Sequence, residues 1–159
     1  MLSEEARRKI NPKTIISKDR IVFLNCSSKR EALLAMAENI STAPQIKDPK
    51  ELSLEILKRE DLMSTAIGFG IAIPHVRLSS ITDLVISVGI SQTGILDFQT
   101  LDDQPVKLLF MIAAAYDQHA YYLQTLSFFS TRLKKAELRD ALLASKNPEE
   151  VYGILTGKT

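Results

Sequence analysis

A histidine that directly follows a proline is the residue in this sequence best suited to carry chemistry. His75 comes after Pro74, at the end of the short apolar run 71–73. Proline fixes its own φ and restricts the residue before it, so we expect a stiff backbone to present the imidazole at the end of a short strand. A neutral imidazole has a nucleophilic nitrogen near pH 7, which serine and threonine lack without an activating base. His75 is therefore the candidate nucleophile.

The residues before His75 are of types that stabilise the negative charge of a phosphoryl group. Arg59 lies near the end of the preceding helix, and its forked guanidinium suits phosphate oxygens. Ser64 and Thr65 add hydroxyl donors, and the glycines of 68–70 let backbone amides approach an anion closely. Phosphoryl transfer needs mainly positioning and stabilisation of charge on the equatorial oxygens. The segment contains the residue types for such a reaction.

Each of these residues also has an ordinary structural explanation. His75 could be a partly buried loop histidine, and 68–70 could simply be a turn. Arg59 could form a surface ion pair with the neighbouring Glu60 or Asp61. Residue types alone leave both interpretations open.

His119 and Tyr122 form a second candidate pair. They are three residues apart, so they can share one face of a helix. Helix surface or the rim of a core is the simpler explanation for both. With two histidines, one cysteine (Cys26) and no acidic cluster at ligand spacing, we expect no metal site, no disulfide and no cofactor. The third glycine of a dinucleotide fingerprint is missing, and so is the Gly-x-Ser-x-Gly elbow of serine hydrolases.

Composition indicates one globular domain over 1–159, with a polar, loosely ordered lead-in at 1–10. Of the 159 residues, 45% are apolar and 25% charged, and the net charge is only +1. This balance argues against nucleic-acid binding, which usually concentrates basic residues on one face. The charged first ten residues exclude a hydrophobic signal region there, and no apolar stretch approaches the roughly 20 residues that span a bilayer. We therefore expect a cytoplasmic protein.

Strand and helix patterns alternate along the chain. Strands are expected at 21–24, 84–90, 95–98 and 106–114, the third joined to the second by a turn at 92–94. Helices are expected from Ser28, which begins a capping box, from Asp48 to about Glu60, at 117–133 and 136–143, and from Asn147. The alternation predicts an α/β domain, and some connections are too short for crossovers, so the sheet should be mixed.

The segments 58–60, 64–68 and 70–75 together resemble the phosphorylation-site signature of the fructose/mannitol-type enzyme IIA family of the phosphoenolpyruvate-dependent phosphotransferase system. Segments 27–33 and 103–110 are similar to the first helix start and a later strand of that family, so the resemblance covers about 10–155. It implies a three-layer domain with a mixed sheet and an enzyme that forms a phosphohistidine. By position, His75 would be the phosphoryl acceptor and Arg59 would support the phosphoryl group.

The resemblance also implies partners. The donor would be an HPr-type phosphohistidine protein, or its nitrogen-branch relative. The segment 104–106 and the free-standing chain are most similar to the nitrogen-regulatory branch, which signals through its phosphorylation state. The alternatives are delivery of phosphate to the IIB component of a fructose or mannitol permease, and a regulatory binding module that has lost transfer. Genomic neighbours would separate transport from regulation.

Two positions depart from the family pattern. After the site histidine, where the family usually has a small residue, stands Val76, whose branched side chain would restrict the backbone and narrow the approach to His75. The second active-site histidine of the family, counted from 104–106, falls on Tyr122, with His119 one turn earlier as a possible substitute.

Overall fold

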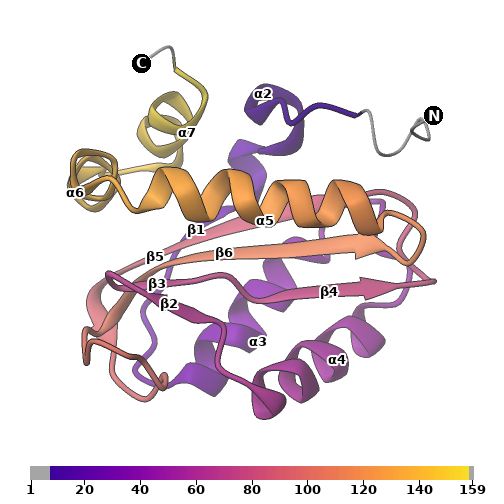
Figure 1. The fold of residues 1–159 in the computed structure, drawn as a ribbon, viewed down its shortest axis with the longest axis horizontal. Helices are drawn as coiled ribbons and strands as arrows, with labels where there is room; N and C mark the ends of the chain where they lie inside the picture. The colour runs from indigo at the N-terminus through magenta and orange to yellow at the C-terminus, as the bar shows by residue number, and fades with distance from the viewer. Residues whose placement is uncertain (1–7, 158–159) are drawn as a thin grey trace.

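The computed structural model describes residues 8–157, and they form a mixed six-stranded sheet (Figure 1). The main strand order is β1-β5-β6-β3-β2, and β4 pairs with β6 further along the same edge as β3. β5 is antiparallel to β6, whereas β1 is parallel to β5 and both β3 and β4 are parallel to β6. The strands are β1 (Ile21–Phe23), β2 (Ala66–Gly68), β3 (Ile71–Ala72), β4 (His75–Leu78), β5 (Val85–Ile95) and β6 (Val106–Ala115). The prediction of a mixed α/β sheet is confirmed.

Helices cover both faces of the sheet and give three layers. One face is covered by α3 (Lys29–Ile40) and α4 (Pro49–Leu62), and α5 (His119–Leu133) runs across the other (Figure 1). On the α5 side lie α2 (Pro12–Ile15), the 3₁₀ turn η1 (Lys18–Arg20), α6 (Ala136–Ala144) and α7 (Pro148–Thr156). The proposed lead-in at 1–10 lies largely outside the described residues.

Alternation along β6 divides the apolar core in two. Leu109, Met111 and Ala113 pack toward α3 and α4, whereas Phe110 and Ile112 pack toward α5. Side chains of a strand point alternately to opposite faces, so a strand covered on both sides must be apolar at nearly every position. This explains why the run 106–114, from which the strand was predicted, is apolar at every position except Lys107.

The predicted helix starts are confirmed by their caps. The side chain of Ser28 accepts a hydrogen bond from the backbone N–H of Glu31 at the start of α3. Asp48 and Asn147 cap α4 and α7 in the same way, each with a proline at the next position. A polar side chain at the cap satisfies one of the amides that have no partner within the helix.

The separate strand predicted at 95–98 is wrong. β5 continues from Val85 to Ile95 with a register shift after Ile90, and 96–98 are not in a strand. Gly94 has φ +88°, and its N–H donates to the Ser91 hydroxyl, so the glycine marks an irregularity inside one strand. A Cβ at Gly94 would also lie 2.7 Å from the ring of Pro105.

The strand that pairs with this edge of β6 is interrupted just before His75. β3 pairs with Leu108 and Leu109 and ends at Ala72, and β4 begins at His75, opposite Ile112. Pro74 has no N–H to donate to the ladder, but its carbonyl accepts from the N–H of Ile112 at 2.9 Å. His75 was expected at the end of a strand; it is the first residue after a break in one.

Candidate functional site

One ring nitrogen of His75 forms a hydrogen bond with the backbone. Nδ1 lies 2.7 Å from the carbonyl oxygen of Ile73. A carbonyl oxygen only accepts hydrogen bonds, so Nδ1 carries the proton and Nε2 keeps its lone pair. Burial lowers the pKa of His75 below its ordinary value, and the nearby charge of Arg59 acts in the same direction. The ring is therefore neutral near pH 7, with Nε2 as the nucleophilic nitrogen.

A chain of hydrogen bonds from α4 holds this imidazole in place. Glu60, which is only 4% exposed, accepts from the Thr65 hydroxyl at 2.6 Å and from the Thr65 N–H. The Thr65 carbonyl in turn accepts from the N–H of Ile73 at 3.0 Å. Because the Ile73 carbonyl fixes the ring of His75, the orientation of the nucleophile traces back to one buried carboxylate.

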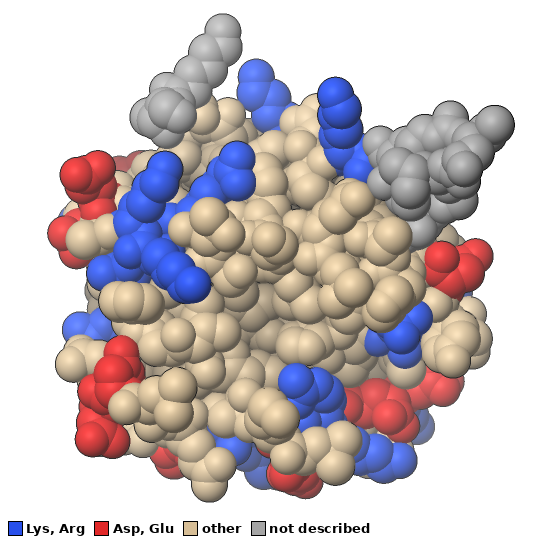
Figure 2. Space-filling view, in the orientation of Figure 1, with Lys and Arg blue, Asp and Glu red and all other residues tan. Residues whose placement is uncertain are grey.

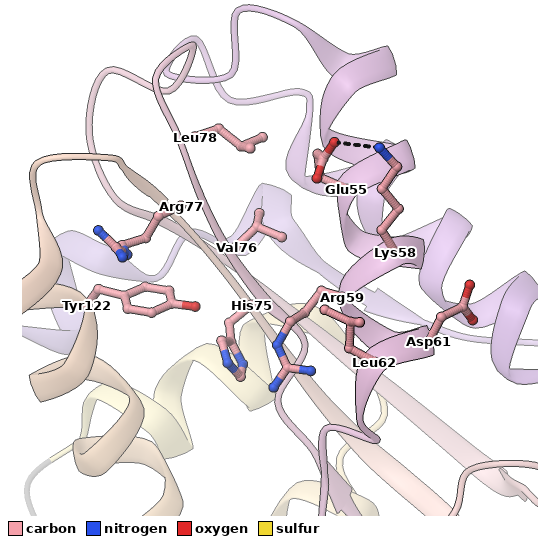
Figure 3. A pocket seen from close by; sticks show the side chains of 10 residues that line it. All are labelled: Glu55, Lys58, Arg59, Asp61, Leu62, His75, Val76, Arg77, Leu78 and Tyr122. Carbon is pink, nitrogen blue, oxygen red and sulfur yellow. Dashed lines mark hydrogen bonds and ion pairs between the residues drawn. The ribbon is translucent and has the colours of Figure 1, made fainter.

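Arg59 comes from the last turn of α4 and lies beside His75 (Figure 3). One terminal nitrogen donates to the carbonyl of Met63 at 2.8 Å, which holds the guanidinium at the end of the helix. Among residues 8–157, Arg59 forms no ion pair with Glu60 or Asp61; Glu60 instead lies 3.8 Å from the ammonium of Lys29. The surface ion pair considered from sequence is therefore not what this arginine makes, and its charge is available to a bound anion.

Two hollows meet at His75 and Arg59. One, of about 600 Å³, is also lined by Arg77, Val76 and Tyr122. The other, of about 410 Å³, is also lined by Ser64, Thr65, Ile67, Leu123 and Ser127. The side chain of His75 thus borders both hollows.

Tyr122 and His119 lie in different surroundings, one beside His75 and the other on the surface. Tyr122 is 8% exposed, and its ring lies edge-on to His75 with the ring centroids 5.5 Å apart. His119, the first residue of α5, is exposed and lines neither hollow. Of the two candidates for the position of the second family histidine, only Tyr122 reaches the site.

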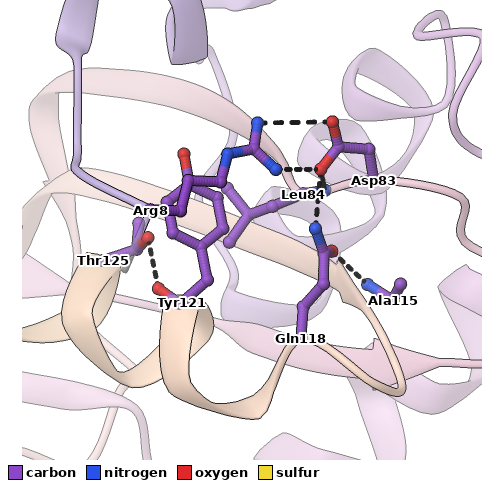
Figure 4. A network of polar contacts seen from close by, with 7 residues as sticks. All are labelled: Arg8, Asp83, Leu84, Ala115, Gln118, Tyr121 and Thr125. Atoms are coloured by element: carbon purple, nitrogen blue, oxygen red, sulfur yellow. Dashed lines mark hydrogen bonds and ion pairs between the residues drawn. The ribbon is translucent and has the colours of Figure 1, made fainter. Parts of the chain in front are cut away.

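The first turn of α5, which carries Tyr122, is anchored by polar contacts (Figure 4). Gln118 donates to the Asp83 carboxylate at 2.6 Å and accepts from the N–H of Ala115 at 2.9 Å. Arg8 pairs with Asp83 at 2.7 Å and lies over the ring of Tyr121. Asp83, in the connection before β5, is thus the hub of this network.

The roles first suggested for Thr65 and the glycines change. The Thr65 hydroxyl donates to Glu60, so it supports the backbone, whereas the half-buried Ser64 lines the second hollow. The three positive-φ residues of 68–70 present the N–H of Phe69 to the side chain of Asp102 at 2.8 Å. The anion at this turn is therefore the protein's own carboxylate, and 68–70 line neither hollow.

Val76 does not close the approach to His75. Its side chain is 7% exposed and packs into the core on the α3/α4 side, opposite to the face on which His75 lies. A β-branched residue suits the extended backbone of β4. Val76 forms part of the wall of the larger hollow.

Sequence reasoning missed two residues of this site, and both had a signal. Glu60 continues the buried spacing of Leu52 and Ile56 at i, i+4, i+8, which places a carboxylate on the apolar face of α4. Arg77 is two residues after His75, and alternate residues of a strand share a face.

Comparison with known proteins decides the family. Residues 14–158 match the family model described as "Phosphoenolpyruvate-dependent sugar phosphotransferase system, EIIA 2". The chain belongs to this EIIA type 2 family. The nitrogen regulatory protein of Escherichia coli is 37% identical to it over 134 residues, which are 84% of this chain and 81% of that protein. The fructose-specific EIIABC component of Bacillus subtilis is 36% identical over 84% of this chain, but the match spans only 21% of that longer protein.

Solved EIIA structures share the fold. The nitrogen regulatory protein IIA-Ntr of Neisseria meningitidis gives a TM-score of 0.82 at 23% identity, covering 91% of this chain and 98% of that one. Mannitol IIA of Escherichia coli gives 0.74 at 21% identity, covering 88% and 98%. The three-layer architecture expected from the sequence is that of its EIIA relatives.

Neither a metal site nor a transmembrane helix occurs among residues 8–157. No three side chains of His, Cys, Asp or Glu are grouped as metal ligands would be. Each helix there is too short or too polar to cross a bilayer.

Proposed function

We propose that this EIIA protein accepts a phosphoryl group on Nε2 of His75 from an HPr-type phosphohistidine donor. The observation that carries the proposal is the hydrogen bond from Nδ1 to the Ile73 carbonyl, since it leaves Nε2 as the unprotonated nitrogen of a ring that borders both hollows. The Nε2 electron pair forms the new bond to phosphorus. The bond between phosphorus and the donor imidazole breaks, and its electron pair returns to the donor ring. Arg59 binds the oxygens that carry the negative charge.

The donor would dock around His75. Leu62, Met63 and Leu123 are 84%, 69% and 49% exposed, and they lie on the elements that flank the site. Large apolar side chains this exposed are typical of a surface that a partner covers. On the face of the molecule that Figure 2 shows, Lys and Arg side chains stand among uncharged residues, and such a mixture suits a protein that presents a phosphorylated side chain.

We assign the protein to the nitrogen-regulatory type, in which phosphorylation state is the signal. The support is 37% identity to nitrogen regulatory proteins over about four-fifths of their length, together with the fold similarity to IIA-Ntr. On this assignment, the phosphorylated and free forms bind a regulatory target differently.

The second candidate function is delivery of phosphate to a IIB component. One support is the 35% identity to the fructose-specific EIIA component of Haloferax volcanii. The other is the fold of enzyme IIAMTL, which was solved in complex with phosphorylated enzyme IIBMTL and compares with this chain at a TM-score of 0.75. Chasing the phosphorylated protein with a fructose- or mannitol-type IIB tests it. Loss of the label to IIB would favour transport over the regulatory type.

The test of phosphorylation compares matched variants with a phosphorylated HPr-type donor. We expect an acid-labile, base-stable adduct on the wild type and on His119→Ala, and none on His75→Ala. Arg59→Lys should slow transfer on the order of 10- to 100-fold, because an ammonium cannot offer two parallel donors. Arg30→Lys, an exposed change on α3, is its control. Equal labelling of His75→Ala and the wild type would overturn the assignment, and a complete absence of labelling would leave a transfer-deficient binding module.

A further inference from the structure

Tyr122 faces His75 from the wall opposite Arg59. Its hydroxyl is directed toward the side of the hollow where His75 and Arg59 lie (Figure 3). The ring is buried and edge-on to His75, at 62° between the ring planes. No other residue of 8–157 forms a hydrogen bond with this hydroxyl, and its oxygen is open to the hollow rather than sealed in the core. A donor that no other group of the described chain engages is thus held beside the nucleophile and can reach a ligand in the hollow.

Arg77 packs behind this tyrosine. It lies on the same face of β4 as His75, and its guanidinium carbon is 5.6 Å from the centre of the Tyr122 ring and 5.1 Å from that of Tyr116. One nitrogen donates to the Tyr116 carbonyl at 2.7 Å, which fixes the side chain between the two rings. It makes no ion pair with a carboxylate in the described part of the chain. A second uncompensated cation therefore borders the hollow.

We infer that the Tyr122 hydroxyl is the second donor to the transferred phosphoryl group and that Arg77 is the residue that positions it. This rests on the proposed acceptance of phosphate by His75. As phosphorus passes from the donor nitrogen to Nε2, charge on the equatorial oxygens is met by Arg59 on one side and by the Tyr122 O–H on the other. Tyr122 keeps its proton throughout, because it only donates a hydrogen bond to a phosphoryl oxygen.

A phenol in this position has a chemical consequence that an imidazole would not have. Burial raises the pKa of Tyr122 to about 12, although the charges of Arg59 and Arg77 oppose the shift. The hydroxyl thus stays protonated over the whole range in which an imidazole gains or loses its donor proton. The pH dependence of transfer should then come from the titration of His75 alone on this protein.

The experiment measures single-turnover transfer from a phosphorylated HPr-type donor between pH 5 and 9. Tyr122→Phe keeps the ring and removes the donor, so we expect a rate lower by on the order of 10- to 100-fold with an unchanged pH profile. Tyr122→His should restore part of the rate and add a second ionisation to the profile. Tyr152→Phe removes a hydroxyl that bonds to the Lys13 carbonyl, far from the hollow, and is the matched control.

The role of Arg77 is tested by a double-mutant cycle. Arg77→Met should slow transfer about 10-fold in the wild type and much less in Tyr122→Phe, because there is no hydroxyl left to position. If Arg77→Met slows transfer as much in Tyr122→Phe as in the wild type, Arg77 does not position the hydroxyl. If Tyr122→Phe transfers at the wild-type rate at every pH, the Tyr122 hydroxyl is not a donor to the phosphoryl group. If His75→Ala still abolishes labelling in that case, the proposed function survives; if it does not, the proposed function itself fails.

Discussion

For the imidazole of His75 to react, two opposed requirements must be met. It must be buried enough for orientation and accessible enough for a partner. The backbone meets the first requirement, since the Ile73 carbonyl holds Nδ1 and fixes the tautomer. The break between β3 and β4 meets the second, since it brings the ring to the hollows at the edge of β6.

At the residue scale, we predict that His75 titrates at lower pH than an ordinary histidine. Burial disfavours the charged ring and lowers its pKa, so the neutral acceptor persists to more acidic pH. Transfer to the protein should then stay level as the pH falls through the ordinary histidine range and decline only below it. NMR titration of the imidazole in a His119→Gln variant, which has a single histidine, gives the midpoint directly. A midpoint at or above the ordinary value would contradict the burial argument.

How much of the site could be predicted depended on how local its signals are. His75 and Arg59 were identified from a local segment and a family resemblance, and the structure brings them together. The hydrogen bond from Thr65 to Glu60 follows the turn after α4, and the packing of Arg77 against Tyr122 joins residues 45 positions apart. Residue types in one sequence give no register between β4 and α5, so the second contact could not be inferred.

At the scale of elements, α4 and the following segment act as one support. The buried Glu60 ties the end of the helix to Thr65, and Thr65 ties the segment to Ile73. A carboxylate inside an apolar face is tolerated because the Thr65 hydroxyl and N–H, together with Lys29, compensate it. The element that supplies Arg59 therefore also aligns His75.

We predict that Glu60→Ala destabilises the protein by about 2–3 kcal/mol, because it leaves the buried donors of Thr65 without an acceptor. Urea unfolding followed by circular dichroism measures the change. Glu38→Ala, an exposed glutamate on α3, should stay within about 0.5 kcal/mol and serves as the control. The variant should also transfer more slowly in native buffer, since the orientation of His75 is loosened. Stability equal to that of Glu38→Ala would show that the Glu60 contacts contribute nothing.

The elements themselves were largely predictable, because their signals are local. Caps at Ser28, Asp48 and Asn147 mark helix starts through a few neighbouring residues. The error in the strand prediction arose where pairing between strands overrides the conformational preference of a single residue. Gly94 has the conformation of a turn, but β5 continues through it because β6 pairs on both sides of the irregularity.

For the whole molecule, contacts between distant segments determine where α5 begins. Arg8 near the start of the described chain, Asp83 before β5 and Gln118 before α5 meet in one network (Figure 4). The backbone carbonyl of Gln118 also accepts a hydrogen bond from the N–H of Tyr122 at 2.9 Å. The position of the hydroxyl opposite His75 thus depends on residues that do not touch the site.

We predict that Asp83→Asn weakens this network and that the loss disappears in acid. Burial alone would raise the pKa of Asp83, but hydrogen bonds from Arg8, Gln118 and the N–H of Leu84 together lower it. A carboxyl whose folded pKa is lowered adds stability above its unfolded pKa, and that stability is lost as the pH falls through the folded value. Because the two side chains are 45% and 42% exposed and solvent screens their charges, the loss at pH 7 should be about 1 kcal/mol or less.

The measurement is the difference in unfolding free energy between the wild type and Asp83→Asn at pH 7 and near pH 3. The difference should shrink at the lower pH, where the wild-type carboxyl is itself being protonated, and Asp140→Asn, an exposed change on α6, should show no such trend. At pH 7 the same variant should transfer phosphate more slowly than Asp140→Asn, because the turn that carries Tyr122 has lost its anchor. A stability difference that does not vary with pH, with transfer unchanged, would mean that α5 is positioned by its apolar face alone.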